Sequence, residues 1–360
     1  MSNKSVVGLG GFLLGLGIGW LIFKNILVTS SNVAWLLIIF GSIVIVSAVV
    51  TPIFPSSQIK NITNGAAGGL ILALLLTQGI GLINLIPGTD IGRLPYSATE
   101  SKQYNGSATF SNIYLKLESI NGPVTISAWD KREYRIEATI TGRGSTQQEA
   151  DENLAKLGKE LVKEETDDIQ KLILQYKSPI LLNSHYKISV DVKIPSTSTA
   201  TLEILTSNGA IKLSNLRGNS ITTQTSNGQI ILTNIIADTV KASTSNAQIN
   251  GNVEAVTFTA ATSNGRVELI LPGTTSGSYD ISTSNAAVSI TVGQSAAYML
   301  KGSTSNGEVT FNLSGLNYST NTRTSKEAQS QNYDKSQIKI NIEIRTSNAN
   351  IDIRGSTISF

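Results

Sequence analysis

Two features of the sequence predict an N-terminal α-helical membrane segment followed by an all-β domain, a single-chain β-solenoid with one inserted helix. The first feature is a set of three long apolar segments within residues 1–90. The second is a TSN triplet that recurs at a nearly constant interval after residue 200. Since only 15% of the 360 residues are charged and 40% are hydrophobic, we expect part of the chain to avoid water. The predicted parts are a membrane segment over 1–90, a linker over 91–106 and the solenoid over 107–360.

The membrane segment is predicted from the scarcity of charge in residues 1–90. Three stretches there are long enough to cross the roughly 30 Å hydrocarbon layer as helices, at about 6–23, 33–54 and 65–86. The numbers of basic residues on the two sides are equal, and Asp90 with the free N-terminus favours an outside position for the C-terminal domain. This predicts a multi-pass protein of the cell membrane, with the lipid bilayer as one partner and the C-terminal domain extracellular.

Three glycines in the first apolar stretch recur every four residues: Gly11, Gly15 and Gly19. Such spacing lets helix backbones approach closely in lipid. The glycines therefore form a predicted helix-packing surface, and two partners remain open. One is another helix of the same chain, and the other is a separate membrane protein.

Composition excludes several kinds of site. The chain has no Cys and a single histidine, His185, so disulfides, thiol nucleophiles and clusters of His ligands are excluded. The formal net charge is only +3, which lacks the electrostatic footprint of a nucleic-acid-binding protein. We expect no metal, no cofactor and no nucleic-acid partner.

The repeat predicts stacked β-coils. The residue after each asparagine of the triplet is Gly or Ala, and the third residue after it is always Val or Ile. The fifth residue is mostly aliphatic and the fourth mostly polar, which is the alternation of a strand with one buried face. A hairpin meander is the rival interpretation, but alanines at 247, 286 and 349 oppose the positive φ of a type I′ turn. A period near twenty residues favours a solenoid.

Two columns of polar residues follow from this stacking. The asparagine column is predicted to be a structural ladder that bonds turn backbone, with a polar ligand-binding strip as the alternative. Its members are Asn121, Asn208, Asn227, Asn246, Asn264, Asn285, Asn306 and Asn348. The threonine column is either a β-prone structural position or a polar binding face. Its members are Thr206, Thr225, Thr244, Thr262, Thr283 and Thr304, and a degenerate copy at Thr324 is expected to fill the gap before Thr346.

A helix-bearing insertion is predicted at about 129–200. Apolar and polar residues alternate from Tyr134 to Ile140, which predicts a strand. Ser145 and Gln148 then form a capping-box pattern, and a helix is expected to run to about Glu165. Two strands follow, at 172–176 and 186–194.

The order of elements resembles a prokaryotic family of unknown function labelled "putative adhesin". The resemblance covers about residues 107–360 and rests on the small-residue turns at Asn208-Gly209, Asn227-Gly228, Asn264-Gly265 and Asn306-Gly307, with the aliphatic residues that follow them. It implies a single-chain β-solenoid, commonly placed behind membrane helices and in some cases beside envelope-stress regulators. It implies no catalytic motif.

We therefore expect a membrane-anchored cell-surface solenoid that acts as a non-catalytic adhesin or envelope-interaction module. Its expected partner is a cell-envelope glycan or a surface protein. The alternative is a membrane regulatory or scaffolding protein that senses the envelope. A carbohydrate-active enzyme is the third hypothesis, and it is disfavoured because only Glu203 and Glu308 flank the repeated motif closely, so no catalytic carboxylate pair emerges.

Overall fold

A computed structural model of the protein describes residues 9–17, 65–66, 68–70, 73, 94–108, 111–166, 170–176 and 185–356. The chain divides into two compact units. One comprises Met1–Pro95 with Pro179–His185, and the other comprises Tyr96–Ser178 with Tyr186–Phe360.

In the first unit, the described residues include a helix over 9–17. Gly11 and Gly15 lie on its buried side, and a Cβ on Gly15 would lie 2.1 Å from the carbonyl oxygen of Ala66. The two backbones therefore touch where the predicted glycine surface begins. Gly19 lies outside the described residues.

The structure contradicts one part of the predicted fold class, namely the helical membrane segment. In the described residues, none of the helices has the length and apolar character needed to cross a bilayer. The same finding overturns the predicted multi-pass membrane localisation. The span predicted at 33–54, and most of those at 6–23 and 65–86, lie outside the described residues. The prediction was made from composition, whereas a span requires one unbroken helix of about 20 residues.

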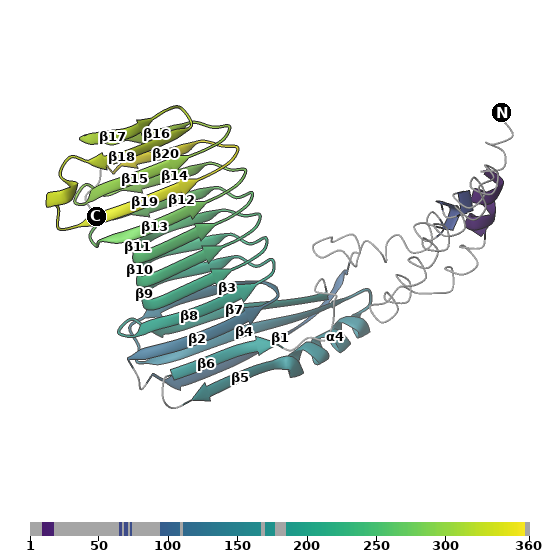
Figure 1. The fold of residues 1–360 in the computed structure, drawn as a ribbon. Helices are drawn as coiled ribbons and strands as arrows, with labels where there is room; N and C mark the ends of the chain where they lie inside the picture. Colours follow the sequence, from purple (N-terminus) through teal and green to yellow (C-terminus); the bar gives the residue numbers. More distant parts are fainter. Residues whose placement is uncertain are drawn as a thin grey trace. The chain divides into compact units, whose positions relative to one another are not determined.

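The second unit is the β-solenoid, in which one 20-stranded sheet is bent so that its two arms, here called the two sheets, face each other across a common core (Figure 1). Successive coils pair in parallel, so equivalent residues lie side by side: Ile211 pairs with Ile230, and Ile230 pairs with Ile249. This pairing confirms the stacked coils and excludes the hairpin meander. The repeat begins with β8 (Thr199–Thr206), β9 (Ile211–Gln224), β10 (Ile230–Ser243), β11 (Ile249–Ala261), β12 (Val267–Leu271), β13 (Gly277–Ser282) and β14 (Val288–Val292).

The core is built from the aliphatic residues predicted by the alternation. The third residue after each asparagine is at most 1% exposed in every coil, because strand geometry turns alternate side chains inward. These residues are Val124, Ile211, Ile230, Ile249, Val267, Val288, Val309 and Ile351.

At the C-terminal end the coils do not stack in chain order. The remaining strands are β15 (Ala297–Ser303), β16 (Val309–Asn312), β17 (Leu316–Asn321), β18 (Ser325–Ser330), β19 (Lys339–Arg345) and β20 (Ile351–Gly355), with a short 3-10 helix, η2 (Tyr333–Lys335), before β19. β19 pairs with both β13 and β15, and β20 pairs with both β14 and β16. The last coil of the chain is therefore inserted between two earlier ones.

The degenerate TSN copy at Thr324 does not form the coil expected of it. β18 runs antiparallel to β15 and to β17, so this segment is half of a hairpin that covers the end of one sheet. The coil that carries Thr346 lies instead between the coils of Thr283 and Thr304.

The N-terminal end shows the same kind of interlock. Its strands are β1 (Tyr96–Ser107), β2 (Asn112–Ser119), β3 (Asn121–Trp129), β4 (Glu133–Gly144), β5 (Leu161–Thr166), β6 (Gln170–Tyr176) and β7 (Tyr186–Pro195). β2 pairs with β6 and β8, and β3 pairs with β7 and β9, all in parallel. The first coil of the chain therefore lies between two later ones, and the insertion supplies a coil of its own.

The inserted helix, α4 (Gln147–Glu160), is shorter than predicted. The helix begins one position later than expected, because its capping box uses Thr146 and Glu149. Thr146 Oγ1 accepts from Glu149 N, and the Glu149 carboxylate accepts from Ser145 N. It packs on β4, where a Cβ on Gly142 would lie 2.3 Å from Leu154 N. Residues expected to extend the helix form β5, which pairs antiparallel with β6. Sheet pairing has overridden local helical preference there.

Candidate functional site

The turn edge is the row of stacked TSN turns along one side of the solenoid. Its threonines point inward, and those from Thr206 to Thr346 are at most 9% exposed. Thr225 Oγ1 donates to the carbonyl oxygen of Gly209 at 3.2 Å and accepts from Gly228 N at 3.1 Å. Thr244 and Thr304 make the corresponding bonds to the neighbouring coil at 3.1 and 2.9 Å.

The threonine column is thus not a surface that a ligand can reach. Each hydroxyl satisfies a backbone carbonyl of the adjacent coil, and several also satisfy an amide of their own turn. The members of this column are buried and bonded to the backbone of the neighbouring coil. Ser119 occupies the same position in the first coil and donates to Ile188 O at 2.6 Å.

The asparagines of the turn edge form one continuous amide ladder. Asn246 Nδ2 donates to Asn227 Oδ1 at 2.6 Å, and Asn264 Nδ2 donates to Asn246 Oδ1 at 2.8 Å. The ladder follows the order of the coils in space, so Asn348 donates to Asn285 and Asn306 donates to Asn348, each at 2.7 Å. Its other links join Asn208 to Asn121, Asn227 to Asn208 and Asn285 to Asn264.

The ladder leaves hydrogen-bonding capacity facing water. A side-chain amide carries two N–H donors and an oxygen with two lone pairs, and each link uses one donor and one lone pair. From Asn227 onward the ladder asparagines are exposed, and so are the serines that precede them. These serines are Ser226, Ser245, Ser263, Ser284, Ser305 and Ser347. The exposed serines and asparagines together form what we call the amide ridge.

The bend edge is the opposite side, where the chain passes from one sheet to the other without a TSN turn. In the first complete coils a single strand bends there, and Asn215 and Asn234 take positive φ values of 57° and 52°. Asn234 Nδ2 donates to Asn215 Oδ1 at 3.0 Å. Further along, the strands break, and loops of residues 272–276, 293–296 and 313–315 replace the bend.

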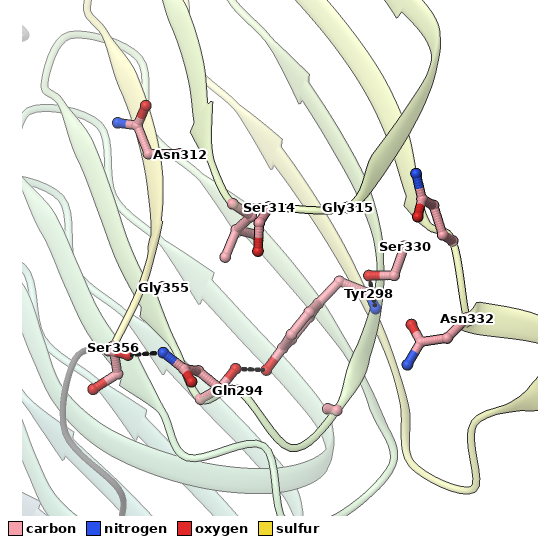
Figure 2. Close-up of a pocket in the computed structure, with 13 residues that line it drawn as sticks. Gln294, Tyr298, Asn312, Ser314, Gly315, Ser330, Asn332, Gly355 and Ser356 are labelled. Carbon is pink, nitrogen blue, oxygen red and sulfur yellow. Dashed lines mark hydrogen bonds between the residues drawn. The ribbon is translucent and has the colours of Figure 1, made fainter.

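A pocket of about 590 Å³ lies at the C-terminal end of the bend edge (Figure 2). Four segments line it: 293–298, 312–315, 330–332 and 355–356. Figure 2 shows Gln294, Ser314 and Asn332 around one hollow, with the Tyr298 ring between them. Among the described residues, the thirteen that line the pocket include no charged side chain.

Two buried tyrosines form hydrogen bonds to the backbone in this part of the bend edge. Tyr298 is 4% exposed, its hydroxyl donates to Gly293 O at 2.6 Å, and its own amide donates to Ser330 Oγ at 2.9 Å. Tyr279 Oη accepts from Ala255 N at 3.1 Å. Burial, and secondarily the nearby Tyr279, raises the pKa of Tyr298 above the ordinary 10.0, and burial raises that of Tyr279 as well. Both phenols therefore stay protonated at neutral pH, and that of Tyr298 belongs to the pocket lining.

Two groups of exposed ion pairs lie on the strands of one sheet of the described solenoid. Glu203 lies 3.9 Å from Lys116, and burial, with a hydrogen bond and negative charge from Glu203, raises the pKa of Tyr114 to about 12. Arg345 bridges Asp280 and Glu343 at 2.5 and 2.6 Å. In the described part of the chain, no group of three or more acidic, His or Cys side chains could hold a metal ion.

The pocket was missed at the sequence level, although the repeat carried a signal for it. The steps between successive TSN triplets are 19, 19 and 18 residues and then 21 and 21. The longer steps fall where β11 gives way to β12 and β13, and then to β14 and β15, so the extra residues lie in loops 272–276 and 293–296. Departures from the period thus mark the bend edge.

The second unit is a single-chain parallel β-solenoid with a repeated turn edge and a variable bend edge. Residues 110–270 match the Toastrack DUF4097 family. This match supports the resemblance in its coarser form, an adhesin-like β-solenoid. None of the curated proteins compared with the chain is significantly similar to it.

Three solved structures are similar to the chain at low sequence identity. A "putative cell adhesion protein" from Clostridium sporogenes is 14% identical, with a TM-score of 0.34 over 72% of this chain and 100% of the other. A "putative adhesin" from Bacteroides fragilis is 12% identical, with a TM-score of 0.32 over 71% and 97%. A "putative lipid binding protein" from Parabacteroides distasonis is 13% identical, with a TM-score of 0.31 over 73% and 98%.

Proposed function

We propose that this chain is a non-catalytic, adhesin-like binding protein whose amide ridge contacts a cell-envelope glycan or a surface protein. The observation that carries the proposal is the continuous ladder from Asn121 to Asn306, which holds a row of amides in fixed register. Each exposed amide keeps a donor and an acceptor for a ligand.

Regular spacing favours a ligand that repeats. Neighbouring ladder positions belong to adjacent strands, which lie about 4.8 Å apart. A polymer with polar groups at short intervals can contact several of them at once, so that weak single contacts add to a useful total affinity. A folded solenoid also holds these groups rigid before binding, which reduces the ordering cost.

The enzymatic hypothesis gains no support from the charged groups. Glu203 pairs with Lys116, and the carboxylates of Asp280 and Glu343 share Arg345. An acid–base pair for glycoside hydrolysis needs two carboxyl groups facing one substrate position, with one pKa raised. Of the two candidate carboxylates near the turn edge, Glu203 lies beside Lys116 and Glu308 is exposed on another coil, so they do not form a facing pair.

The test is binding of the full chain to whole bacterial cells and to purified envelope polysaccharide, measured before and after the amide ridge is altered. Ser226→Glu, Ser245→Glu and Ser263→Glu together place three carboxylates on the ridge without removing a ladder amide. Thr233→Glu, Thr257→Glu and Ser278→Glu add the same charge at exposed positions on the sheets. We expect the ridge variant to lose binding and the sheet variant to keep it. Equal binding by all three proteins would contradict the proposal.

A further inference from the structure

We propose that the pocket at the C-terminal end of the bend edge binds an uncharged saccharide unit. This inference rests on the proposed function, because it gives the adhesin-like solenoid a site for a terminal sugar in addition to its ridge. The pocket is absent from the repeat pattern and is created where the last coil is inserted into the stack.

The chain builds the pocket from segments that are distant in sequence. The inserted coil brings Gly355 and Ser356 beside the loop after β14, where Gln294 Nε2 donates to Ser356 O at 2.7 Å. This bond fixes the Gln294 amide and leaves its Oε1 available. Gly293 is required because a Cβ there would lie 1.8 Å from Pro272 O. On the opposite side of the pocket the chain turns at Gly315, whose φ is +67°.

The polar groups of the pocket suit hydroxyl groups. Among the described residues, the side chains of Ser314, Gln331 and Asn332 line the pocket and make no hydrogen bond within the protein. They offer both donors and acceptors, and Gln294 Oε1 offers a further acceptor. A sugar hydroxyl both donates and accepts, so it can satisfy such a mixed set.

The remaining features select against other small ligands. A charged ligand would lose water and find no opposite charge, because the lining side chains are neutral and the Tyr298 phenol stays protonated. An entirely apolar ligand would leave the polar groups unpaired. Ala296, Leu313 and the Tyr298 ring supply a limited apolar surface for the C–H face of a sugar. The volume of about 590 Å³ falls in the range of small-molecule sites, roughly 300–1,000 Å³.

The experiment uses the full chain and five named probes. Glucose, galactose and N-acetylglucosamine are the uncharged sugars, and glucuronic acid and N-acetylneuraminic acid are charged counterparts. Ligand-observed saturation-transfer NMR detects binding, and calorimetric titration measures affinity. We expect at least one uncharged sugar to bind and both acids to bind more weakly.

Two variants alter the pocket and one serves as a matched control. Ser314→Ala with Asn332→Ala removes two unpaired polar groups, and should lower the affinity about tenfold. Ser314→Trp fills the hollow and should abolish binding. Asn317→Ala with Asn321→Ala truncates two exposed amides on β17 of the same hairpin, outside the pocket, and should leave affinity unchanged. Equal melting temperatures of the four proteins show that all are folded.

Each outcome decides the inference. Loss of sugar binding in both pocket variants, with the control unaffected, supports it. Absence of binding by the wild-type chain, tighter binding of the acids, or unchanged affinity in the pocket variants overturns it. If the pocket variants still bind whole cells as the wild-type chain does, the ridge proposal stands by itself. If sugar binding is present while the ridge variant binds cells normally, the ridge proposal fails and the pocket inference stands.

Discussion

The turn edge and the bend edge of the solenoid connect the same two sheets, yet they are built on opposite plans. At the turn edge the coils from β8 onward repeat the TSN triplet, and its threonines donate to the backbone of the neighbouring coil. At the bend edge a bent strand is gradually replaced by loops of different sequence. Uniformity therefore marks the edge that stabilises the stack, and variation marks the edge that forms a pocket.

The difference also appears in the chemistry of the buried groups. The turn edge uses threonine hydroxyls, which do not titrate near physiological pH, whereas the C-terminal bend edge uses the phenols of Tyr279 and Tyr298. The two edges should consequently respond differently to mutation and to alkaline pH. Four predictions, in order of decreasing effect, test this contrast.

The largest effect is expected from Thr225→Val at the turn edge. Valine has nearly the shape of threonine, but it leaves Gly209 O and Gly228 N without the partner that Thr225 Oγ1 supplies. Two unsatisfied buried groups should cost about 3 kcal/mol of the free energy of unfolding, measured by urea denaturation. Thr233→Val, at an exposed position on the sheet, is the control and should change it by less than about 0.5 kcal/mol. Equal stability of the two variants would refute the structural role of the threonines.

Tyr298→Phe, at the bend edge, should have the next largest effect on stability. The change removes the 2.6 Å bond to Gly293 O and should cost about 1–2 kcal/mol at neutral pH. Urea denaturation measures the loss, and near-ultraviolet circular dichroism reports the environment of the remaining tyrosines.

The pH dependence of stability in the same variant tests whether the pKa of Tyr298 is raised. Because burial raises the pKa of Tyr298 above 10.0, its contribution is fully present below about pH 10 and is lost as pH rises through the higher folded-state value. The wild-type chain should therefore lose stability more steeply above pH 10 than Tyr298→Phe does. Parallel stability curves for the two proteins would show that Tyr298 titrates normally.

Asn246→Ala should have a moderate effect at the turn edge. It breaks the links to Asn227 and Asn264, but the freed amides can bond to water at this exposed position. We expect a loss of about 1 kcal/mol, measured as a shift of the denaturation midpoint. Asn219→Ala, an exposed asparagine outside the ladder, should cost close to nothing. A loss as large as that of Thr225→Val would mean that the ladder, and not the threonines, carries the stability of this edge.

The smallest effect is expected on the sheet face between the two edges. Lys301 and Glu327 form an ion pair at 3.0 Å, with 55% and 40% of their side chains exposed. Exposed pairs of this kind contribute little to stability, and salt screens them. Lys301→Ala should therefore change the denaturation midpoint least, and the difference should vanish at high ionic strength. A larger loss would place part of the stability of the stack outside its edges.

The comparison also shows where sequence patterns lose their predictive power. Alternating apolar residues after each asparagine identified the buried positions, because a side chain in a strand points to one face whatever its neighbours are. Local sequence patterns also predicted the start of α4 and the bounds of the strands β6 and β7 to within a few residues. It failed at Leu161–Thr166, where pairing with β6 turns an expected helical end into a strand.

The sequence by itself determined the coil: its period, its inward aliphatic residues and the positions of the threonines and asparagines. Only the tertiary structure decided the order of the coils, with β2 and β3 enclosed at one end and β19 and β20 inserted at the other. The physical reason is that coils with the same inward residues and the same turns can stack on one another interchangeably, so the local sequence does not specify which neighbour a coil meets. The pocket depends on that order, since Ser356 reaches Gln294 only because the last coil lies inside the stack.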